Sequence, residues 1–218
     1  MLSIDQTLRA SYTKQGFVVV KGLVDDFVPE IRRLVSDDDS FRAMAIDTGR
    51  YELLRARFPL LNALCSDLGL IDACRSVLNG DVCYLKDKLI CKPPGAGGFE
   101  EHRDMEFGWG RFVTEALTAV IPLDPMTVQN GCLELLPGSH TDRNRTGLWK
   151  TAEVNVGDVL LFDGWTLHRS GPNRSPANRS AYFITCNAAT DGNRHSDYYE
   201  WMQQYPQGVR REDVLDTY

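Results

Sequence analysis

The stretch that decides the fold is "GDVLLFDGWTLH", residues 157–168. A glycine and an aspartate precede a run of four apolar residues, which is the composition of a short strand buried in a sheet. A histidine stands at the end of the stretch, where a side chain can face the interior of a barrel. We therefore expect one buried strand here, ending at His168.

Further strands are expected on both sides of this stretch. "DVCYLKDKLICK" at 81–92 alternates, "ALTAVIPL" at 116–123 is typical of a buried strand, and "GCLELLPGSH" at 131–140 alternates into a Pro-Gly turn. The apolar segment "RSAYFITCNAA" at 179–189 adds another strand. Many short strands with Gly and Pro turns favour a double-sheet barrel or jelly roll flanked by helices.

The helices are expected mainly before residue 80. Helical apolar spacing occurs in "IDQTLRASYTKQG" at 4–16 and in "DDFVPEIRRLVSDD" at 25–38, with a β-branched strand, "FVVVKG", at 17–22. "FPLLNALCSDLG" at 58–69 and "LIDACRSVLNG" at 70–80 predict two more helices, each ended by its glycine. None of these segments contains a histidine.

The length of 218 residues suits a single domain. We expect this domain, 1–218, to comprise a helical region over about 1–80, a jelly-roll core over about 81–192 and a C-terminal tail. In that tail "SDYYEWMQQYP" at 196–206 predicts a short amphipathic helix.

Charge and hydropathy exclude two classes of partner. The formal net charge is −6 and the basic residues are scattered, so a nucleic-acid partner is not expected. The apolar run at 17–20 is too short for a signal peptide or a membrane span, so neither a membrane partner nor export is expected. The predicted location is therefore the cytoplasm.

"FEEHRDMEFGWG" at 99–110 carries a candidate metal site. His102 and Asp104 are two residues apart, so on an extended segment both side chains point to one face. A metal needs a third protein ligand, and the remaining histidines of the chain are His140, His168 and His195. Position alone favours His168 only modestly, because His140 lies in a turn and His195 in a polar loop.

An arginine decides between these histidines. Arg179 follows His168 by eleven residues and opens an apolar strand, where a guanidinium is costly unless it meets an anion such as a carboxylate. Two histidines and one carboxylate on one face of a metal leave open positions, the arrangement of non-haem Fe(II) oxygenases. A 2-oxo acid can chelate such a metal while its far carboxylate binds the arginine, which leaves a position for O₂.

The sequence resembles the phytanoyl-CoA dioxygenase family of Fe(II)/2-oxoglutarate oxygenases. The resemblance is carried, in order, by "KDKLICKPPGAGGFEEHRD", "NGCLELLPGSH", "GDVLLFDGWTLHRSGPN" and "ANRSAYFITCNAATDG". It implies a double-stranded β-helix, that is, a cupin-like jelly roll. It also implies that the iron ligands are His102, Asp104 and His168. The partner of the C5 carboxylate of 2-oxoglutarate is then Arg179, and Ser170 is the serine that assists this arginine. Lys88 is a further candidate for cofactor or substrate contact.

Departures from the family pattern concern the substrate. Arg103 stands where many members have glutamine, and Val120 where many have tryptophan. The candidate substrate residues are Arg103, Glu106, Trp109 and Trp165, although tryptophans such as Trp109 and Trp165 more often belong to the core. Acidic residues near the motif could form either a solvated rim or a pocket biased toward a cation: Glu100, Glu101, Glu106 and Glu115.

The function expected from these residues is oxidation of a C–H bond of a small molecule by an Fe(II)- and 2-oxoglutarate-dependent dioxygenase, with release of succinate and CO₂. Hydroxylation is the default outcome, with oxidative cyclisation or desaturation as variants, and the acidic residues suggest an amine-bearing natural-product or amino-sugar intermediate. Two alternatives remain open: a non-catalytic jelly-roll module that binds a metal or ligand, and a zinc-dependent hydrolase. The oligomeric state is not predicted.

Overall fold

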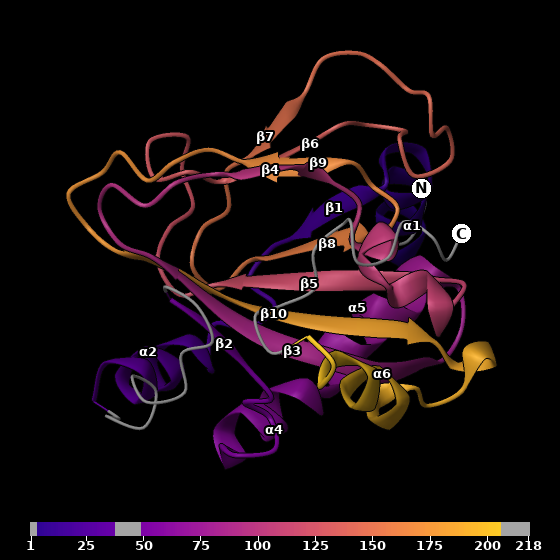
Figure 1. Cartoon of the computed structure of the whole chain (residues 1–218), viewed down its shortest axis with the longest axis horizontal. Helices are drawn as coiled ribbons and strands as arrows, with labels where there is room; N and C mark the ends of the chain where they lie inside the picture. The colour runs from indigo at the N-terminus through magenta and orange to yellow at the C-terminus, as the bar shows by residue number, and fades with distance from the viewer. Residues whose placement is uncertain (1–3, 38–48, 206–218) are drawn as a thin grey trace.

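The computed structural model describes residues 4–37 and 49–205, arranged as two antiparallel sheets with helices against the larger one (Figure 1). The helices are α1 (Ile4–Gln15), α2 (Val28–Asp37), α4 (Pro59–Cys65), α5 (Leu68–Leu78) and α6 (His195–Met202), with short 3₁₀ turns η1 (Asp104–Phe107), η2 (Trp109–Arg111) and η3 (Ala189–Asp191). The strands are β1 (Phe17–Val20), β2 (Arg50–Glu52), β3 (Val82–Lys92), β4 (Phe99–His102), β5 (Ala116–Pro122), β6 (Leu133–Leu135), β7 (Lys150–Ala152), β8 (Val159–Asp163), β9 (His168–Ser170) and β10 (Arg179–Ala188). The parts of the expected N-terminal helical region and C-terminal tail at 1–3, 38–48 and 206–218 lie outside the described residues.

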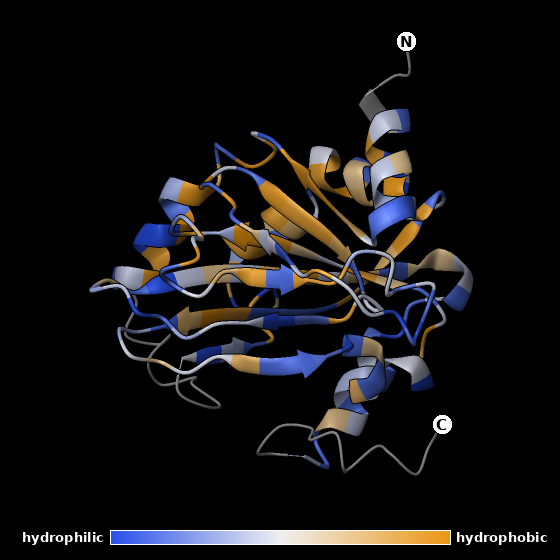
Figure 2. Ribbon diagram, turned by 90° about the horizontal axis from the view of Figure 1, so that it is seen from above, coloured by the Kyte–Doolittle hydropathy of each residue, from blue (hydrophilic) through white to orange (hydrophobic). Residues whose placement is uncertain are grey.

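The strand order confirms the predicted jelly-roll fold. The larger sheet runs β1-β8-β5-β10-β3-β2 and the smaller one β4-β9-β6-β7, and the neighbouring strands are antiparallel. The facing surfaces of the two sheets enclose an apolar core that includes Phe162 and Val120 from the larger sheet and Leu135 from the smaller one. A second core lies between the outer face of the larger sheet and the helices. Figure 2 shows hydrophobic residues concentrated on the strands in the middle of the molecule.

The segment at 157–168 is two strands rather than the one that the sequence predicted. β8 ends at Asp163, whose backbone carbonyl accepts from Thr166 N (2.8 Å) and whose carboxylate accepts from Trp165 N (2.8 Å). Gly164 sits in this turn, where a Cβ would meet Met105 Cγ at 3.0 Å. The chain then crosses to the other sheet, so His168 begins β9 instead of ending β8.

The predicted glycine ends of two helices also need correction. α4 ends at Cys65, and Gly69 lies inside α5, because the Asp67 carboxylate accepts from Leu70 N (2.9 Å) and starts a new helix there. The left-handed residue after α5 is Asn79 (φ 57°), not Gly80. Asparagine tolerates this conformation better than most residues, so it can end a helix in the place of glycine.

A buried carboxylate ties the edge strands to the helical layer. Asp87 on β3 is fully buried and accepts from Leu54 N and Arg55 N (both 3.0 Å), from Tyr182 Oη (2.6 Å) and from Tyr84 Oη. These bonds fix the segment after β2 against β3 and β10. They therefore help to position the edge of the sheet that faces the site described below.

Replacing Asp87 with alanine should lower the free energy of unfolding by at least about 3 kcal/mol, because it leaves several buried donors without an acceptor. Urea unfolding of the purified protein measures this change. The matched control is Asp72→Ala, because the Asp72 side chain is 69% exposed and, among the described residues, pairs only with exposed Arg75. Equal stability of the two variants would show that the Asp87 network contributes little.

Within the described residues, no helix combines the length and the apolar character needed to cross a bilayer.

Candidate functional site

Three side chains from two distant segments of the sequence meet between the two sheets: His102 and Asp104 from one segment, and His168 from the other. His102 at the end of β4 and His168 at the start of β9 are directly paired across these antiparallel strands. Their Nε2 atoms lie 3.9 Å and 4.0 Å from the two oxygens of Asp104. One ligand atom from each of the three residues lies within 4.8 Å of the others, a spacing that suits a single metal ion.

Backbone carbonyls orient both imidazoles. His102 Nδ1 contacts the carbonyl of Glu100 at 2.7 Å, and His168 Nδ1 contacts that of Thr166 at 2.9 Å. Since a carbonyl can only accept, each Nδ1 carries the proton and each Nε2 keeps its lone pair. This tautomer presents both Nε2 atoms to the Asp104 carboxylate, as metal-binding histidines require.

The electrostatics favour ligands that are ready to bind a cation at neutral pH. Burial lowers the pKa of His168 to about 4, so its imidazole is neutral near pH 7. Burial also opposes ionisation of Asp104, but Lys88 and the two histidines outweigh it and lower the pKa of this carboxyl. A neutral imidazole and an ionised carboxylate are the forms that bind a divalent metal.

The expected extended geometry of the motif holds only in part. Arg103 is extended (φ −117°, ψ 129°), which puts its neighbours on one side, but Asp104 already begins the 3₁₀ turn η1. The backbone N–H of Met105 donates to Gly164 O (3.1 Å) and holds this turn against the β8–β9 crossover. The turn after β8 therefore positions Asp104 and His168 together.

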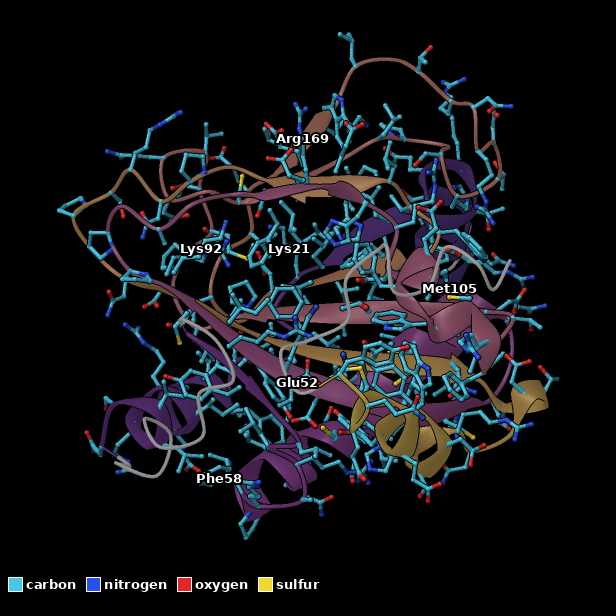
Figure 3. The ribbon with its side chains drawn as sticks, viewed as in Figure 1. Lys21, Glu52, Phe58, Lys92, Met105 and Arg169 are labelled. Atoms are coloured by element: carbon cyan, nitrogen blue, oxygen red, sulfur yellow. The ribbon has the colours of Figure 1, made fainter. Side chains whose placement is uncertain are left out.

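A second group of polar side chains lies where β10 begins. Arg179 is 2% exposed and is paired in register with Lys92 of β3. Its NH2 group donates to Gly131 O (2.7 Å), while Lys92 Nζ donates to Ser170 Oγ (2.8 Å) and Gly171 O (2.7 Å). In Figure 3 Lys92 lies between the two sheets.

This basic group lacks a counter-charge. Among the described residues Arg179 Nε is buried and has no hydrogen-bond partner, and neither Arg179 nor Lys92 forms an ion pair. Burial lowers the pKa of Arg179 to about 10 and, with Arg179 beside it, that of Lys92 to about 8. A buried cation with an open donor fits a carboxylate ligand. The residues present thus fit both groups that the resemblance implies: iron at the triad and 2-oxoglutarate between the triad and Arg179.

The triad, Arg179 and Ser170 line one cavity of about 470 Å³ between the sheets. Lys88 lines it as well, on the same face of β3 as Lys86, and these lysines lie opposite the histidine strands. Arg50 of β2 and Tyr198 of α6 close this side of the cavity. Lys88 is a candidate from the sequence, whereas no site role is predicted from the sequence for Lys86, Lys92 or Arg50.

Of the four candidate substrate residues, the structure brings only Trp109 into the lining of this cavity. Arg103 is 7% exposed and is held away from the cavity, because it donates to Trp165 O and Arg143 O (both 3.1 Å). Glu106 lies 3.5 Å from the same guanidinium, and Trp165 stacks under Arg143 at 3.5 Å. Arg103, Glu106 and Trp165 thus support the loop outside the cavity and do not line it.

The expected acidic rim divides in two. Glu100 and Glu101 are exposed and line the cavity, whereas Glu106 pairs with Arg103. Glu115 lies elsewhere, where its backbone N–H contacts Asp191. Only the first two can act on a bound molecule.

The two remaining histidines lie outside the metal cluster. His140 contacts the carbonyl of Thr13 (3.1 Å), and His195 contacts that of Leu85 (2.8 Å) at the start of α6. Both connect loops or helices to their neighbours in the fold.

A jelly roll with an inward-facing His-Asp-His triad and a buried arginine in the same cavity defines the class of Fe(II)/2-oxoglutarate-dependent dioxygenases. The model of the family "Phytanoyl-CoA dioxygenase (PhyH)" matches residues 12–181. The chain therefore belongs to the phytanoyl-CoA dioxygenase family.

Individual proteins with similar sequences include two enzymes that are named for phosphonates. Methylphosphonate hydroxylase from Gimesia maris is 31% identical over 146 residues, covering 60% of this chain and 55% of the relative. The 2-aminoethylphosphonate dioxygenase of uncultured bacterium HF130_AEPn_1 is 28% identical over 157 residues, covering 65% and 60%. The chain thus spans somewhat more than half the length of these relatives.

A solved structure supports the fold. EctD from S. alaskensis with bound Fe superposes with a TM-score of 0.74 at 22% identity, covering 87% of this chain and 78% of that one. The same protein has also been solved with 2-oxoglutarate and 5-hydroxyectoine.

Proposed function

We propose that the protein is an Fe(II)- and 2-oxoglutarate-dependent dioxygenase that oxidises a C–H bond of a small molecule. One observation carries the proposal: the triad His102, Asp104 and His168 shares a cavity with a buried arginine that has an open donor. The triad suits the metal, and Arg179 suits the far carboxylate of the co-substrate.

In this proposal the residues of the chain bind the metal and the co-substrate, orient them and exclude water from the site. His102 and His168 offer Nε2 to the metal while their Nδ1 protons stay on backbone carbonyls, and Asp104 supplies the negative charge. Lys92 donates to Ser170 and holds this serine beside Arg179. When bound, iron and 2-oxoglutarate supply the oxidising chemistry: O₂ is consumed, 2-oxoglutarate becomes succinate and CO₂, and the substrate C–H bond becomes C–OH.

The proposed substrate carries an amine. Glu100 and Glu101 give the cavity lining two exposed carboxylates, which attract a cation. The name of one relative, 2-aminoethylphosphonate dioxygenase, specifies a substrate with an amino group. Hydroxylation is the proposed outcome, and mass spectrometry of the product distinguishes it, as a gain of one oxygen atom, from cyclisation or desaturation, which remove two hydrogen atoms.

Two measurements test the proposed activity. Anaerobic protein loaded with Fe(II) and 2-oxoglutarate should show a metal-to-ligand absorption band, and admission of O₂ should release succinate. No band would contradict the proposal, and a band without succinate would indicate a non-catalytic binding module. Hydrolytic activity that needs zinc and proceeds without O₂ would instead indicate a hydrolase.

A further inference from the structure

The inner face of the larger sheet changes from apolar to basic toward its β2 edge. In register, Val120 of β5 faces Phe183 of β10, Phe183 faces Lys88 of β3, and Lys88 faces Glu52 of β2. Because side chains on one face recur every two residues, Lys86 and Arg50 share this face with Lys88 and Glu52. We call these four residues the basic wall of the cavity.

The single carboxylate of the basic wall, that of Glu52, forms ion pairs with two cations. Glu52 is 6% exposed, lies 3.4 Å from Lys86 Nζ and also pairs with Arg50. Burial opposes ionisation of Glu52, but Lys86 and Arg50 outweigh it and lower its pKa to about 2. Lys86 also donates to Tyr198 Oη at 2.8 Å. Figure 3 shows Glu52 in the lower part of the molecule, beside α6.

Lys88 lacks such a partner. Within the described part of the chain its ammonium has no hydrogen bond or ion pair, only the ring of Phe183 at 5.3 Å. Burial lowers its pKa to about 8 against the attraction of Asp104. Since Asp104 also belongs to the metal triad, a bound divalent ion takes up the negative charge that faces Lys88.

The basic wall therefore holds three cations against the single carboxylate of Glu52. Lys88 is half-buried, and an ammonium removed in part from water without a carboxylate partner is costly, so its presence needs a functional explanation. An aromatic ring attracts a cation without neutralising it. Arg169, which also borders the cavity, does not add to this excess, because it pairs with Glu134 at 2.5 Å and stacks on Trp149.

The co-substrate does not account for this excess. Arg179 is in register with Lys92, four residues from Lys88 along β3, or roughly 13 Å at the usual strand rise. A 2-oxoglutarate with one carboxylate at Arg179 and the other committed to the metal leaves the charge of Lys88 without a partner.

We propose that Lys88, with Lys86 and Arg50 behind it, forms a subsite for an oxyanion group of the primary substrate, such as a carboxylate or a phosphonate. This inference rests on the proposed function and narrows it. Together with Glu100 and Glu101, the subsite selects small zwitterionic or anionic molecules and disfavours purely cationic ones.

Binding of ethylphosphonate tests the subsite directly, with its dimethyl ester as the neutral probe. Phosphorus NMR titrations use protein with saturating 2-oxoglutarate and Zn(II) as a redox-inert substitute for iron. Lys88→Met removes the charge and keeps most of the volume, Lys88→Arg keeps the charge, and Lys14→Met makes the same change at an exposed position. Unfolding curves show whether each variant is folded.

We expect wild-type protein, Lys88→Arg and Lys14→Met to bind ethylphosphonate more tightly than the ester. Lys88→Met should bind ethylphosphonate at least about tenfold more weakly, because it loses a charge-assisted hydrogen bond. Equal binding of the two probes by wild type, or unchanged binding by Lys88→Met, would overturn the subsite. So would a loss of 2-oxoglutarate affinity in Lys88→Met equal to that of an Arg179 variant, because Lys88 would then serve the co-substrate.

The same proteins loaded with Fe(II) separate this inference from the proposed function. Stimulation of O₂-dependent succinate release by acids but not by their amides supports both. If the absorption band and succinate release are observed without a preference for acids, the dioxygenase proposal is supported and the subsite is refuted. If ethylphosphonate binding depends on Lys88 but no absorption band is observed, the anion subsite is supported and the dioxygenase proposal is refuted.

Discussion

Asp104→Ala is expected to weaken Fe(II) binding by at least about a hundredfold and to abolish succinate release. Asp104 is the single carboxylate of the triad, between imidazoles whose Nε2 atoms lie 3.9 Å and 4.0 Å from its oxygens. Without it the site keeps two neutral nitrogen ligands and faces the ammonium of Lys88. A cation would then enter a positively charged cavity with no negative ligand to offset the repulsion.

Metal analysis after anaerobic loading and desalting measures the iron retained by the Asp104 variant. Asp197→Ala is the matched control, because the Asp197 side chain is 50% exposed and pairs with Arg194 on α6. The control should keep one iron per chain and the absorption band. Full iron content in Asp104→Ala would mean that the metal lies elsewhere or that the histidines suffice.

Local patterns in the sequence were enough to predict the jelly roll. Apolar and β-branched runs bounded by Gly and Pro predict strands because each strand is buried on at least one face, as β5 and β10 are. The triad could be predicted because few residues of the sequence compete for the role of metal ligand. The histidines are few, and Arg179 is conspicuous at the start of an apolar strand.

Features that depend on pairing between distant segments were not predictable. The Asp163–Gly164 dipeptide inside the run at 159–168 is typical of a turn, but it does not indicate that the chain crosses from β8 in one sheet to β9 in the other. β2 has only three residues, and Arg50 enters the cavity solely because β2 pairs with β3. The position of Arg103 depends on the carbonyls of Trp165 and Arg143, which come from other loops.

Arg179→Met is expected to weaken 2-oxoglutarate binding by about a hundredfold or more, while iron binding stays unchanged. Methionine fills much of the volume of arginine but cannot bind a carboxylate. Arg179 lies on β10, outside the triad, and its guanidinium contacts Gly131 and not a metal ligand. Titration of the anaerobic absorption band with 2-oxoglutarate measures the affinity, and Arg174→Met, at an exposed position in the preceding loop, is the control.

The same Arg179 variant should bind 2-oxoglutarate more weakly but should not be less stable than the wild type when no ligand is present. In the free protein Arg179 is a buried cation beside Lys92, with Nε unsatisfied, so its removal relieves repulsion and a desolvation penalty. The free energy of unfolding should therefore stay equal or rise, and added 2-oxoglutarate should stabilise only the wild type. A variant that is less stable and keeps its 2-oxoglutarate affinity would show that Arg179 supports the fold. The predicted loss of affinity with retained stability is what a binding residue requires, because its charge is compensated only when the ligand is present.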